Sequence, residues 1–364
     1  MIPLSELLSA LIGVAQKGAH VASIIRSDAD LLELLVQEKS SKEKNPRFVH
    51  DFKTLADVII QEMVRHDLSK EFAGIESRIH GEESSIFTNT LGETVVVQLK
   101  NSVEETKTLL CDVLNGNSVA AGLLAEAVHS SISASMKSTF RHVTGEIPIS
   151  DVCVWIDPID STAQYIQGQV GCPNEFGIVN EGLQCVTILI GAYNRITGLP
   201  VMGVVVQPFA HFDELSKRWK TEINWGVCHN NRFSSFDDQT IPKRIPTVIV
   251  SSSESEDVRH KLSKDFCLQY AAGAGYKLLC VARGLVDAYV LSRASIFSWD
   301  CCALHAVLLA LGGGLVAFSD VLSQDVCQVK YNHVTSTKHG HSIAGVVAYR
   351  SENNRQAIVT CLKS

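Results

Sequence analysis

Apolar residues recur at helical spacing through much of the first third of the chain. Runs with apolar positions at i, i+3, i+4 and i+7, bounded by polar or turn-forming residues, are typical of amphipathic helices. We predict helices at residues 4 to 26, 29 to 39, 54 to 70 and 103 to 114. A strand is predicted at 94 to 99, and the polar stretch from 131 to 146 is predicted to be a surface loop.

From residue 151 the pattern changes to short apolar runs that are typical of strands. We predict strands at 151 to 157, 183 to 193 and 199 to 208. The turn NRITG joins the last two, and because its Gly198 can adopt a positive φ we expect an antiparallel hairpin. Residues 213 to 244 are polar and are predicted to be irregular.

Strands and helices alternate in the remainder of the chain. The pattern predicts strands at 247 to 253 and 285 to 291, a helix at 254 to 264 and a helix from residue 300. This order is that of an α/β unit. We therefore predict an N-terminal α+β domain, residues 1–240, and a C-terminal α/β domain, residues 241–364.

The charge balance narrows the class of partner. The chain has 32 Lys and Arg against 39 Asp and Glu, and shows no basic stripe, so we expect no nucleic-acid partner. An acidic protein that handles a phosphate ester must overcome repulsion locally, usually with bound divalent cations. The composition is therefore compatible with a metal site.

The cysteines and the N-terminus bear on location. Eleven cysteines are scattered without a C-x-x-C pair, and several, such as Cys185 and Cys280, lie in apolar runs. We interpret them as reduced core thiols and expect a cytoplasmic protein.

The apolar N-terminal segment does not fit a signal peptide, because Glu6 interrupts it and no basic cluster precedes it. No run reaches the eighteen or so apolar residues of a membrane span, and we expect no membrane insertion.

Two carboxylates end the strand at 151 to 157. Pro158 cannot be a central member of a sheet ladder, so we predict that the chain turns there and brings Asp157 and Asp160 together. With the Ile159 carbonyl they offer the oxygen ligands that Mg²⁺ prefers. An ordinary Asp-Pro turn with a capping Asp is the alternative.

Two further acidic motifs are weaker on their own. Glu82 and Glu83 follow Gly81, and neighbouring glutamates of this kind are usually a solvated surface pair. Asp300 opens an apolar helix, where it could simply be an N-cap.

The three motifs together resemble the lithium-sensitive, magnesium-dependent inositol monophosphatase-like superfamily. GEES at 81 to 84, DPIDST at 157 to 162 and WDCCA at 299 to 303 occur in the order and approximate spacing of that superfamily. The segments GLQCVTILIGAY, AAGAGYKLLCVARGLVDAYV and KEKNPRFVHDFKTLADVIIQE resemble its branch that acts on inositol polyphosphates. The resemblance extends from about residue 4 to 350 and implies a five-layered αβαβα fold of α+β and α/β parts.

The resemblance also implies roles. The implied metal ligands, for two or three Mg²⁺ ions, are Glu82, Glu83, Asp157, Ile159, Asp160 and Asp300. The implied catalytic residues are Asp57, Thr162 and Glu83. Asp57 and Thr162 would form a dyad that orients and deprotonates the attacking water, because a hydroxyl alone is a poor base.

The substrate contacts are implied in the same way. They are Asp160, Ser161, Thr162, Ser253, Ser255, Gly273, Ala274, Lys277 and Ser295. Small residues allow close approach of the backbone to a ligand, and Lys277 would add a positive charge for a second phosphate. Ser255 stands where the family commonly has lysine, and Ser295 where it has threonine.

The implied activity is hydrolysis of the 1-phosphate of inositol 1,4-bisphosphate and inositol 1,3,4-trisphosphate by a lithium-inhibited monomer. A 3′(2′),5′-bisphosphate nucleotidase is one alternative, and a non-catalytic inositol phosphate binding protein is another. A serine hydrolase is disfavoured because the chain has no G-x-S-x-G elbow.

Overall fold

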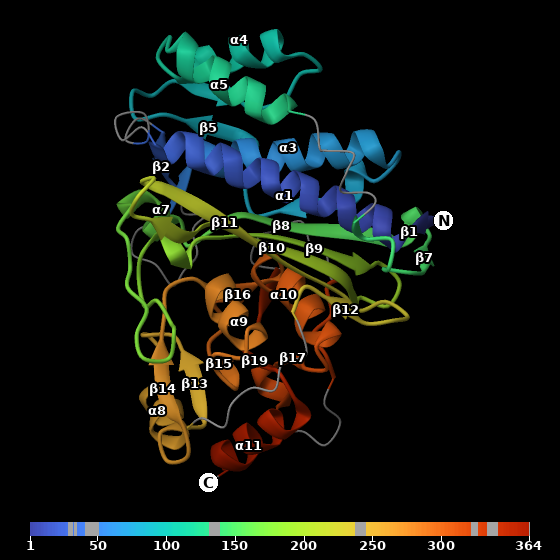
Figure 1. Ribbon diagram of the computed structural model, residues 1–364, viewed down its shortest axis with the longest axis vertical. Coiled ribbons are helices and arrows are strands. Elements are labelled where there is room, and N and C mark those ends of the chain that lie inside the picture. The colour runs from blue at the N-terminus through green and yellow to red at the C-terminus, as the bar shows by residue number, and fades with distance from the viewer. Residues whose placement is uncertain are drawn as a thin grey trace.

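Two sheets form the framework of the molecule, and helices cover and separate them (Figure 1). The structure, a computed structural model, describes residues 1–27, 32, 35–40, 51–130, 139–236, 245–321, 327–332 and 341–363. Its successive layers are α1 (Leu4–Ser27) with α3 (Leu55–Glu71), the first sheet, α9 (Ala274–Ala282) with α10 (Ser298–Ala310), the second sheet, and α8 (Glu256–Leu262) with α11 (Glu352–Lys363). The predicted five-layered αβαβα fold is confirmed.

The first sheet has six strands and holds the predicted hairpin. Its order is β12-β11-β10-β9-β8-β4, antiparallel except for the parallel pair β4–β8. The strands are β4 (Ile79–Gly81), β8 (Val152–Asp160), β9 (Thr187–Asn194), β10 (Pro200–Asp213), β11 (Arg218–Val227) and β12 (Phe233–Ser234). Every residue of β8 is buried, because helices cover both faces of the sheet.

The second sheet has five strands in the order β14-β13-β15-β19-β17. The pairs of β13 are parallel, and those of β19 are antiparallel. The strands are β13 (Thr247–Val250), β14 (Cys267–Tyr270), β15 (Ala288–Leu291), β17 (Gly314–Ala317) and β19 (Val346–Tyr349). The short strand β16 (Ile296–Phe297), directly before α10, pairs with β18 (Ser342–Ile343).

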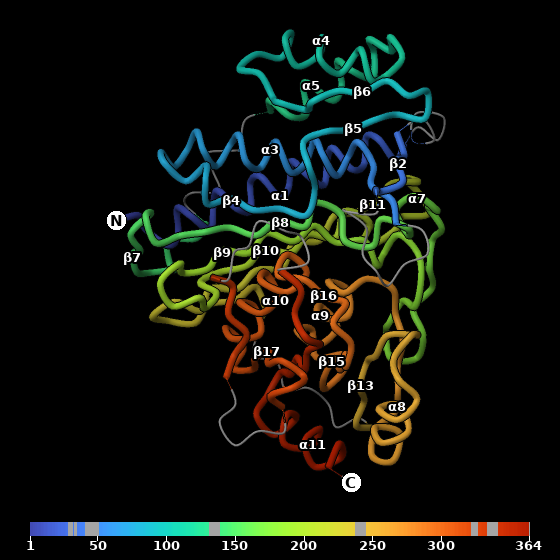
Figure 2. The backbone as a smooth tube through the Cα atoms, turned by 180° about the vertical axis from the view of Figure 1, so that it is seen from behind, coloured from blue at the N-terminus to red at the C-terminus, as the bar shows by residue number. Residues whose placement is uncertain are grey.

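Smaller elements surround these layers. Seen from behind, α4, α5 and the β5–β6 ladder lie outside α3, on its side away from the first sheet (Figure 2). They are α4 (Val103–Val113), α5 (Ser118–His129), β5 (Ile86–Thr88) and β6 (Thr94–Val96). The remaining strands and α-helix of the described residues are β1 (Ile2–Pro3), β2 (Val36–Glu38), β3 (Phe52–Thr54), β7 (Glu146–Ile147) and α7 (Thr162–Gln167). Short 3₁₀ turns occur at Glu76–Arg78, Ile149–Asp151, Leu183–Cys185 and Phe318–Asp320.

A row of glycines lets α10 approach the first sheet closely. Gly203 on β10 stands opposite Gly191 on β9 and Gly226 on β11. A Cβ on Gly203 would lie 1.9 Å from the carbonyl oxygen of Ala303 in α10, and one on Gly191 would lie 2.5 Å from the Ala303 nitrogen. A Cβ on Gly226 would lie 2.6 Å from the Cα of Val307. Backbone therefore packs on backbone where α10 crosses the sheet.

α1 fills the space between α3 and the first sheet. It is a described helix long and apolar enough, by length and composition alone, to cross a membrane, and 78% of its most apolar window is buried inside the fold. The core helix of a layered protein has the same character. None of the eleven cysteines, all of which lie in the described part of the chain, forms a disulfide; six are buried, whereas Cys172 and Cys327 are exposed and are not core residues.

Several local predictions were wrong. Residues 36 to 38 are not helical but form β2, which pairs with β3, while most of 28 to 34 lies outside the described residues. The segment 213 to 244 is not irregular at its start, because β11 spans Arg218–Val227. The strand predicted at 94 to 99 is shorter, and α5, α9 and α11 were not predicted.

The prediction that the chain turns out of the sheet at Pro158 was wrong. Strand β8 continues through the proline to Asp160. Its ladder with β4 ends at Ile156, so the missing N–H of Pro158 breaks no bond on that side. On the other side the register with β9 shifts between Asp157 and Asp160, which accommodates the proline in a bulge. The predicted domain boundary near 240 lies in residues 237–244, outside the described part.

Candidate active site

A pocket of about 390 Å³ opens where the end of β8 meets α7, α9 and α10. Eleven of the predicted site residues line it: Glu82, Asp157, Ile159, Asp160, Ser161, Thr162, Gly273, Ala274, Lys277, Ser295 and Asp300. The motifs at 81 to 84, 157 to 162 and 299 to 303, far apart in sequence, thus meet at one place.

Three carboxylates form the acidic centre of this pocket. Asp157, Asp160 and Asp300 each present an oxygen, and these oxygens lie within 4.8 Å of one another. Asp157 is 1% exposed, and among the described residues its Oδ1 has no hydrogen-bond partner. Three acceptor groups that converge without enough donors fit a hard divalent cation.

Repulsion within this centre appears in its pKa values. Burial, followed by the charges of Glu82, Asp160 and Asp300, raises the pKa of Asp157 well above its usual range. Burial and the charges of Asp160 and Glu82 raise the pKa of Asp300 to about 8. A bound cation would remove this penalty, because it favours the ionised form of each carboxylate.

The bulge in β8 places the first two carboxylates on one side of the strand. Residues three apart on a regular strand face opposite ways. Asp157 pairs with Leu189 and Asp160 with Thr187, so β8 has one residue more than β9 over this stretch. Because of this extra residue, the side chains of Asp157 and Asp160 lie on the same side of the strand. Ser161 follows with a φ of 73° and starts α7.

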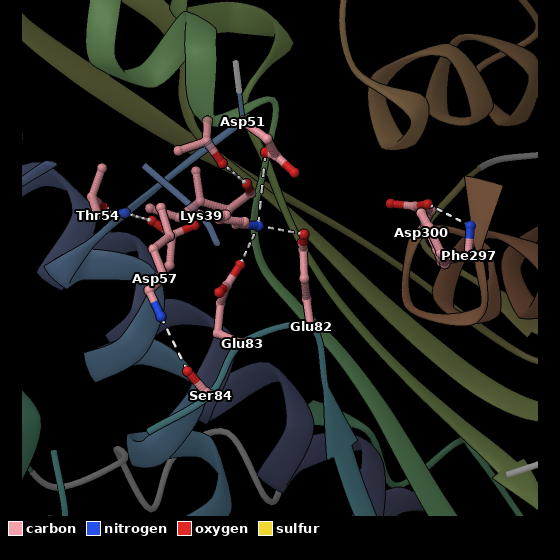
Figure 3. Close-up of polar contacts among 12 residues, drawn as sticks. Lys39, Asp51, Thr54, Asp57, Glu82, Glu83, Ser84, Phe297 and Asp300 are labelled. Carbon is pink, nitrogen blue, oxygen red and sulfur yellow. Dashed lines mark hydrogen bonds and ion pairs between the residues drawn. The ribbon is translucent and has the colours of Figure 1, made fainter. Parts of the chain in front are cut away.

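Asp300 is held by the start of α10. It occupies the N3 position, and its Oδ2 accepts a hydrogen bond from the Phe297 nitrogen at 2.7 Å (Figure 3). It is therefore the acidic member of the first turn and not the N-cap itself. The close packing of α10 on the glycine row fixes this turn against the sheet that carries Asp157.

Asp160 is fixed by donors from two other elements. Its Oδ1 accepts from the Ala274 nitrogen at 3.2 Å, and its Oδ2 accepts from the Gly275 nitrogen at 2.9 Å. The Thr187 hydroxyl on β9 also donates to Oδ2, at 3.2 Å. Burial raises the pKa of Asp160, while Lys277 and these donors oppose the rise.

Glu82 and Glu83 face a lysine that the sequence did not single out. The Lys39 Nζ lies 2.7 Å from Glu82 Oε1, 2.5 Å from Glu83 Oε1 and 3.9 Å from Asp51 Oδ1 (Figure 3). Burial lowers the pKa of Lys39, but the attraction of these three acids outweighs it and raises the pKa well above its usual value. Lys39 thus supplies the counter-charge for this acidic pair.

Gln61 holds the backbone that presents these glutamates. Its side-chain amide accepts from the Glu83 nitrogen at 2.9 Å and donates to the Glu83 carbonyl at 2.5 Å. A Cβ on Gly81 would lie 2.0 Å from the Gln61 oxygen. The glycine of the GEES motif is therefore required for Gln61 to approach.

The predicted catalytic pair makes other hydrogen bonds in this structure. Asp57 Oδ2 accepts from the backbone nitrogen of Thr54 at 2.7 Å and from its hydroxyl at 2.6 Å, at the start of α3. The Thr162 hydroxyl donates to the Ile159 carbonyl at 3.0 Å. Burial and the charge of Glu83 raise the pKa of Asp57 to about 7. The Asp57–Thr162 dyad stays a prediction.

Two predicted substrate residues are not among those that line the pocket. The Ser255 hydroxyl caps α8 by accepting from the Val258 nitrogen at 3.3 Å. The Ser253 hydroxyl lies 3.0 Å from that of Ser251. Their contacts with substrate stay predictions.

Sequence reasoning missed the residues that support the carboxylates. Lys39, Gln61 and Thr187 lie in elements that carry none of the three acidic motifs, and each reaches the site through tertiary packing. Phe297, Trp299 and Tyr270 also line the pocket. For Trp299 a signal existed, since it is the first residue of the WD motif, and Phe297 lies two residues before it. Nothing in the local pattern singles out Gln61.

This fold, with its acidic pocket, belongs to a known class. The sequence model that describes the inositol monophosphatase family matches residues 4–354 of this chain. The chain is therefore a member of that family. It is an enzyme of the phosphatase class.

Among individual relatives, the chain is 38% identical to the inositol polyphosphate 1-phosphatase of Mus musculus over 387 residues, which cover 99% of this chain and 97% of the relative. The Homo sapiens enzyme of that name is likewise 38% identical, over 390 residues with the same coverage. The 3′(2′),5′-bisphosphate nucleotidase 1 of Dictyostelium discoideum is 30% identical over 180 residues, 47% of this chain and 53% of the relative. The family resemblance predicted from the motifs is confirmed.

Solved structures share the fold. The Thermotoga maritima inositol monophosphatase TM1415 superposes with a TM-score of 0.54 at 15% identity, covering 98% of this chain and 97% of that one. The suhB protein of Bartonella henselae gives 0.55 at 14% identity and 99% coverage of both chains.

Proposed function

We propose that this protein hydrolyses the 1-phosphate of inositol 1,4-bisphosphate and inositol 1,3,4-trisphosphate with Mg²⁺ as cofactor. The observation that carries the proposal is the triad of buried Asp157 and Asp160 and half-buried Asp300 at the centre of the pocket. The 38% identity with inositol polyphosphate 1-phosphatases over nearly the whole chain supports the choice of substrate.

The residues of the pocket suit phosphate transfer. Mg²⁺ bound by the triad, with Glu82 and the Ile159 carbonyl, would supply positive charge to the phosphate oxygens and to the attacking water. Asp57, whose pKa of about 7 suits proton transfer at neutral pH, is the proposed proton acceptor, and Thr162 would orient the water. Ser161 and Ser295, in the pocket lining, are proposed to contact the substrate.

The nucleotidase activity is the second candidate. Nucleotidases match at 30 to 31% identity, but only over 45 to 47% of this chain, which favours the inositol substrates. A binding protein without activity is the third candidate. It is disfavoured because all the predicted metal ligands are present and three of them converge.

Release of phosphate from two substrates tests the choice. We expect magnesium-dependent release from inositol 1,4-bisphosphate that exceeds release from adenosine 3′,5′-bisphosphate at equal concentration. The reverse preference would assign the chain to the nucleotidases. Binding of inositol 1,4-bisphosphate without release from either substrate would support the binding protein.

Lithium sensitivity is part of the proposal. Li⁺ is small and hard, so carboxylate oxygens that hold Mg²⁺ can hold it, but it carries half the charge. We expect uncompetitive inhibition that grows with substrate, because Li⁺ would occupy the site with product phosphate still bound. Velocities measured across substrate at several LiCl concentrations, with NaCl keeping ionic strength constant, test this, and purely competitive inhibition would contradict it. We further propose a cytoplasmic monomer.

A further inference from the structure

One edge of the second sheet contributes hydroxyl groups to the pocket. Tyr270, Ser252 and Ser295 line the pocket and come from the end of β14, the loop after β13 and the segment after β15. These strands are parallel neighbours, so their carboxyl ends lie at the same edge of the sheet. A row of hydroxyl groups at that edge suits the polar part of a substrate that the metal does not hold.

Glu254 joins two of these connections. It is 3% exposed and does not itself line the pocket. Its Oε2 accepts a hydrogen bond from the Ser292 nitrogen at 2.9 Å, and its Oε1 accepts from the Ser292 hydroxyl. Oε1 also accepts from the nitrogen of Ser255, in the loop of Glu254 itself, at 2.7 Å. One carboxylate therefore bridges the loop after β13 and the segment after β15.

The pocket residues lie close to this bridge along the chain. Ser252 lies two residues before Glu254, whose nitrogen donates to the Ser251 carbonyl at 3.0 Å. Ser295 lies three residues after Ser292, and its Oγ has no hydrogen-bond partner among the described residues. Because both connections are short, a shift at the bridge moves Ser252 and Ser295 relative to each other.

The end of the segment next to α10 is held by other contacts. β16 pairs with β18, and the Ser298 hydroxyl donates to the His341 carbonyl at 3.3 Å. The glycine row of the first sheet fixes the start of α10, which carries Asp300. Loss of the Glu254 bridge should therefore displace Ser295 more than Asp300.

We propose that Glu254 is a positioning residue of the substrate pocket, which sets the distance between Ser252 and Ser295. The inference rests on the proposed function, because it assigns this edge of the pocket to the ring and second phosphate of the inositol bisphosphate. Glu254 thus acts on the affinity for substrate and leaves the affinity for metal and the chemical step unchanged.

The test compares three variants of the full-length protein. Glu254→Gln keeps the size of the side chain but turns an NH₂ group toward at least one of the donors. Ser292→Ala removes only the hydroxyl donor. Asp287→Asn is the matched control, because Asp287 Oδ2 accepts from the Thr247 nitrogen at 2.7 Å and so joins β13 and β15 at their other ends, outside the pocket lining.

We expect Glu254→Gln to raise KM for inositol 1,4-bisphosphate about tenfold, since a hydrogen bond to a charged group is worth about that factor. Its kcat should change less than about twofold, as is typical when binding alone is lost. Two quantities should stay unchanged. They are KM for p-nitrophenyl phosphate, which has no second phosphate, and Mn²⁺ affinity, measured from the electron paramagnetic resonance signal of free Mn²⁺.

Hydrogen exchange measures the bridge directly. The amides of Ser255 and Ser292 should exchange faster in Glu254→Gln than in wild type and in Asp287→Asn. Ser292→Ala should raise KM for the bisphosphate by a smaller factor, and it decides the proposal if Glu254→Gln does not fold. Asp287→Asn should lose stability to urea and keep the KM of wild type.

An unchanged KM in Glu254→Gln, or an equal rise in Asp287→Asn, would overturn the proposal. So would a fall in Mn²⁺ affinity that accounts for the whole effect. Wild-type protein that cleaves adenosine 3′,5′-bisphosphate but not inositol 1,4-bisphosphate would defeat the proposed function, and KM for the nucleotide would then decide the role of Glu254. If wild type cleaves neither, the dissociation constant of inositol 1,4-bisphosphate in the same variants decides it.

Discussion

Asp157 occupies the most demanding position in the site. It is buried, four other carboxylates raise its pKa, and its Oδ1 has no hydrogen-bond partner among the described residues. Such an atom costs folding free energy unless a ligand satisfies it. The residue is therefore explained by what it binds and not by what it contributes to the fold.

We predict that Asp157→Asn lowers kcat at least a thousandfold, because the amide removes a charge from the centre of the triad. The fold should survive, since the substitution relieves repulsion. Phosphate release and circular dichroism measure the two effects, with Asp112→Asn on the exposed face of α4 as control. Activity within tenfold of wild type at saturating Mg²⁺ would show that Asp157 is not a metal ligand.

Lys39 offers a second prediction at the residue scale. Lys39→Met leaves buried Glu83 and half-buried Glu82 without their counter-charge, so the metal-free protein should lose about 3 kcal/mol of unfolding free energy. Mg²⁺ should restore more stability to this variant than to wild type, because a cation can replace the ammonium.

Urea unfolding with EDTA and with Mg²⁺ measures this difference. Lys17→Met is the matched control, because Lys17 pairs with Asp67 at 2.5 Å and neither residue lines the pocket. It should be destabilised without a Mg²⁺-specific recovery. Equal recovery in both variants would show that the effect does not arise at the acidic pair.

At the scale of elements, α10 joins the two sheets and carries Asp300. The row of Gly191, Gly203 and Gly226 sets its distance from the first sheet. Any side chain at Gly203 would push against the Ala303 carbonyl and move the helix start that holds Asp300.

We predict that Gly203→Ala lowers the free energy of unfolding by about 2 kcal/mol through overpacking, and also weakens Mn²⁺ binding. Gly122→Ala in α5 is the control, because its Cβ would meet the Lys107 side chain no closer than 3.6 Å. That change should stabilise the helix by up to about 1 kcal/mol. If Gly203→Ala is destabilised but its Mn²⁺ affinity is unchanged, the packing of α10 on the first sheet does not control the metal site.

The sequence predicts the long strands of the first sheet better than the elements around them, and it misses α9 although that helix is buried between the sheets. The runs that became β8, β9 and β10 are long, apolar and bounded by turns. β11 was missed because its first half, with Arg218, Lys220 and Glu222, is polar, and Glu222 pairs with Arg283 across 61 residues. Residues 36 to 38 became a strand because β3 pairs with them, which local helical spacing cannot reveal.

In the candidate site, too, some residues could be predicted from the sequence and others could not. Asp157 and Asp160 were predictable from their own local motif, whereas Asp300 could have been an N-cap and was assigned to the metal only through the family resemblance of the three motifs together. The supports of those groups were not, because Gln61 and Thr187 reach them across long separations and belong to ordinary helical and strand patterns. Lys39 stands only beside a polar segment, which gives no sign of its ion pairs.

At the scale of the whole molecule, the acidic centre links pH to stability. Folding raises the pKa of Asp300 from 3.8 to about 8 and that of Asp57 to about 7. A raised carboxyl pKa contributes stability that is fully present below the unfolded value and is lost as pH rises through the folded value. Each such group costs up to about 1.4 kcal/mol per pH unit between those limits.

We therefore predict that the metal-free protein loses stability as pH rises from 6 to 8, and that Mg²⁺ flattens this dependence. Chemical unfolding at several pH values, with EDTA or Mg²⁺, measures it. Asp300→Asn should reduce the slope of the metal-free protein. A metal-free stability that rises over this range would contradict the prediction.

The contact of α10 with the glycine row is made by backbone atoms and by the Cβ atoms of Cys302, Val307 and Ala310, whose positions the backbone fixes, and this has a consequence for redesign. A contact between backbones has no rotamers to rearrange, so the gap it sets should not respond to changes in the aliphatic core around it. Metal-site distances and overall stability then become separately adjustable properties. A library that randomises core residues but keeps the three glycines should give proteins that differ widely in melting temperature yet share one metal affinity.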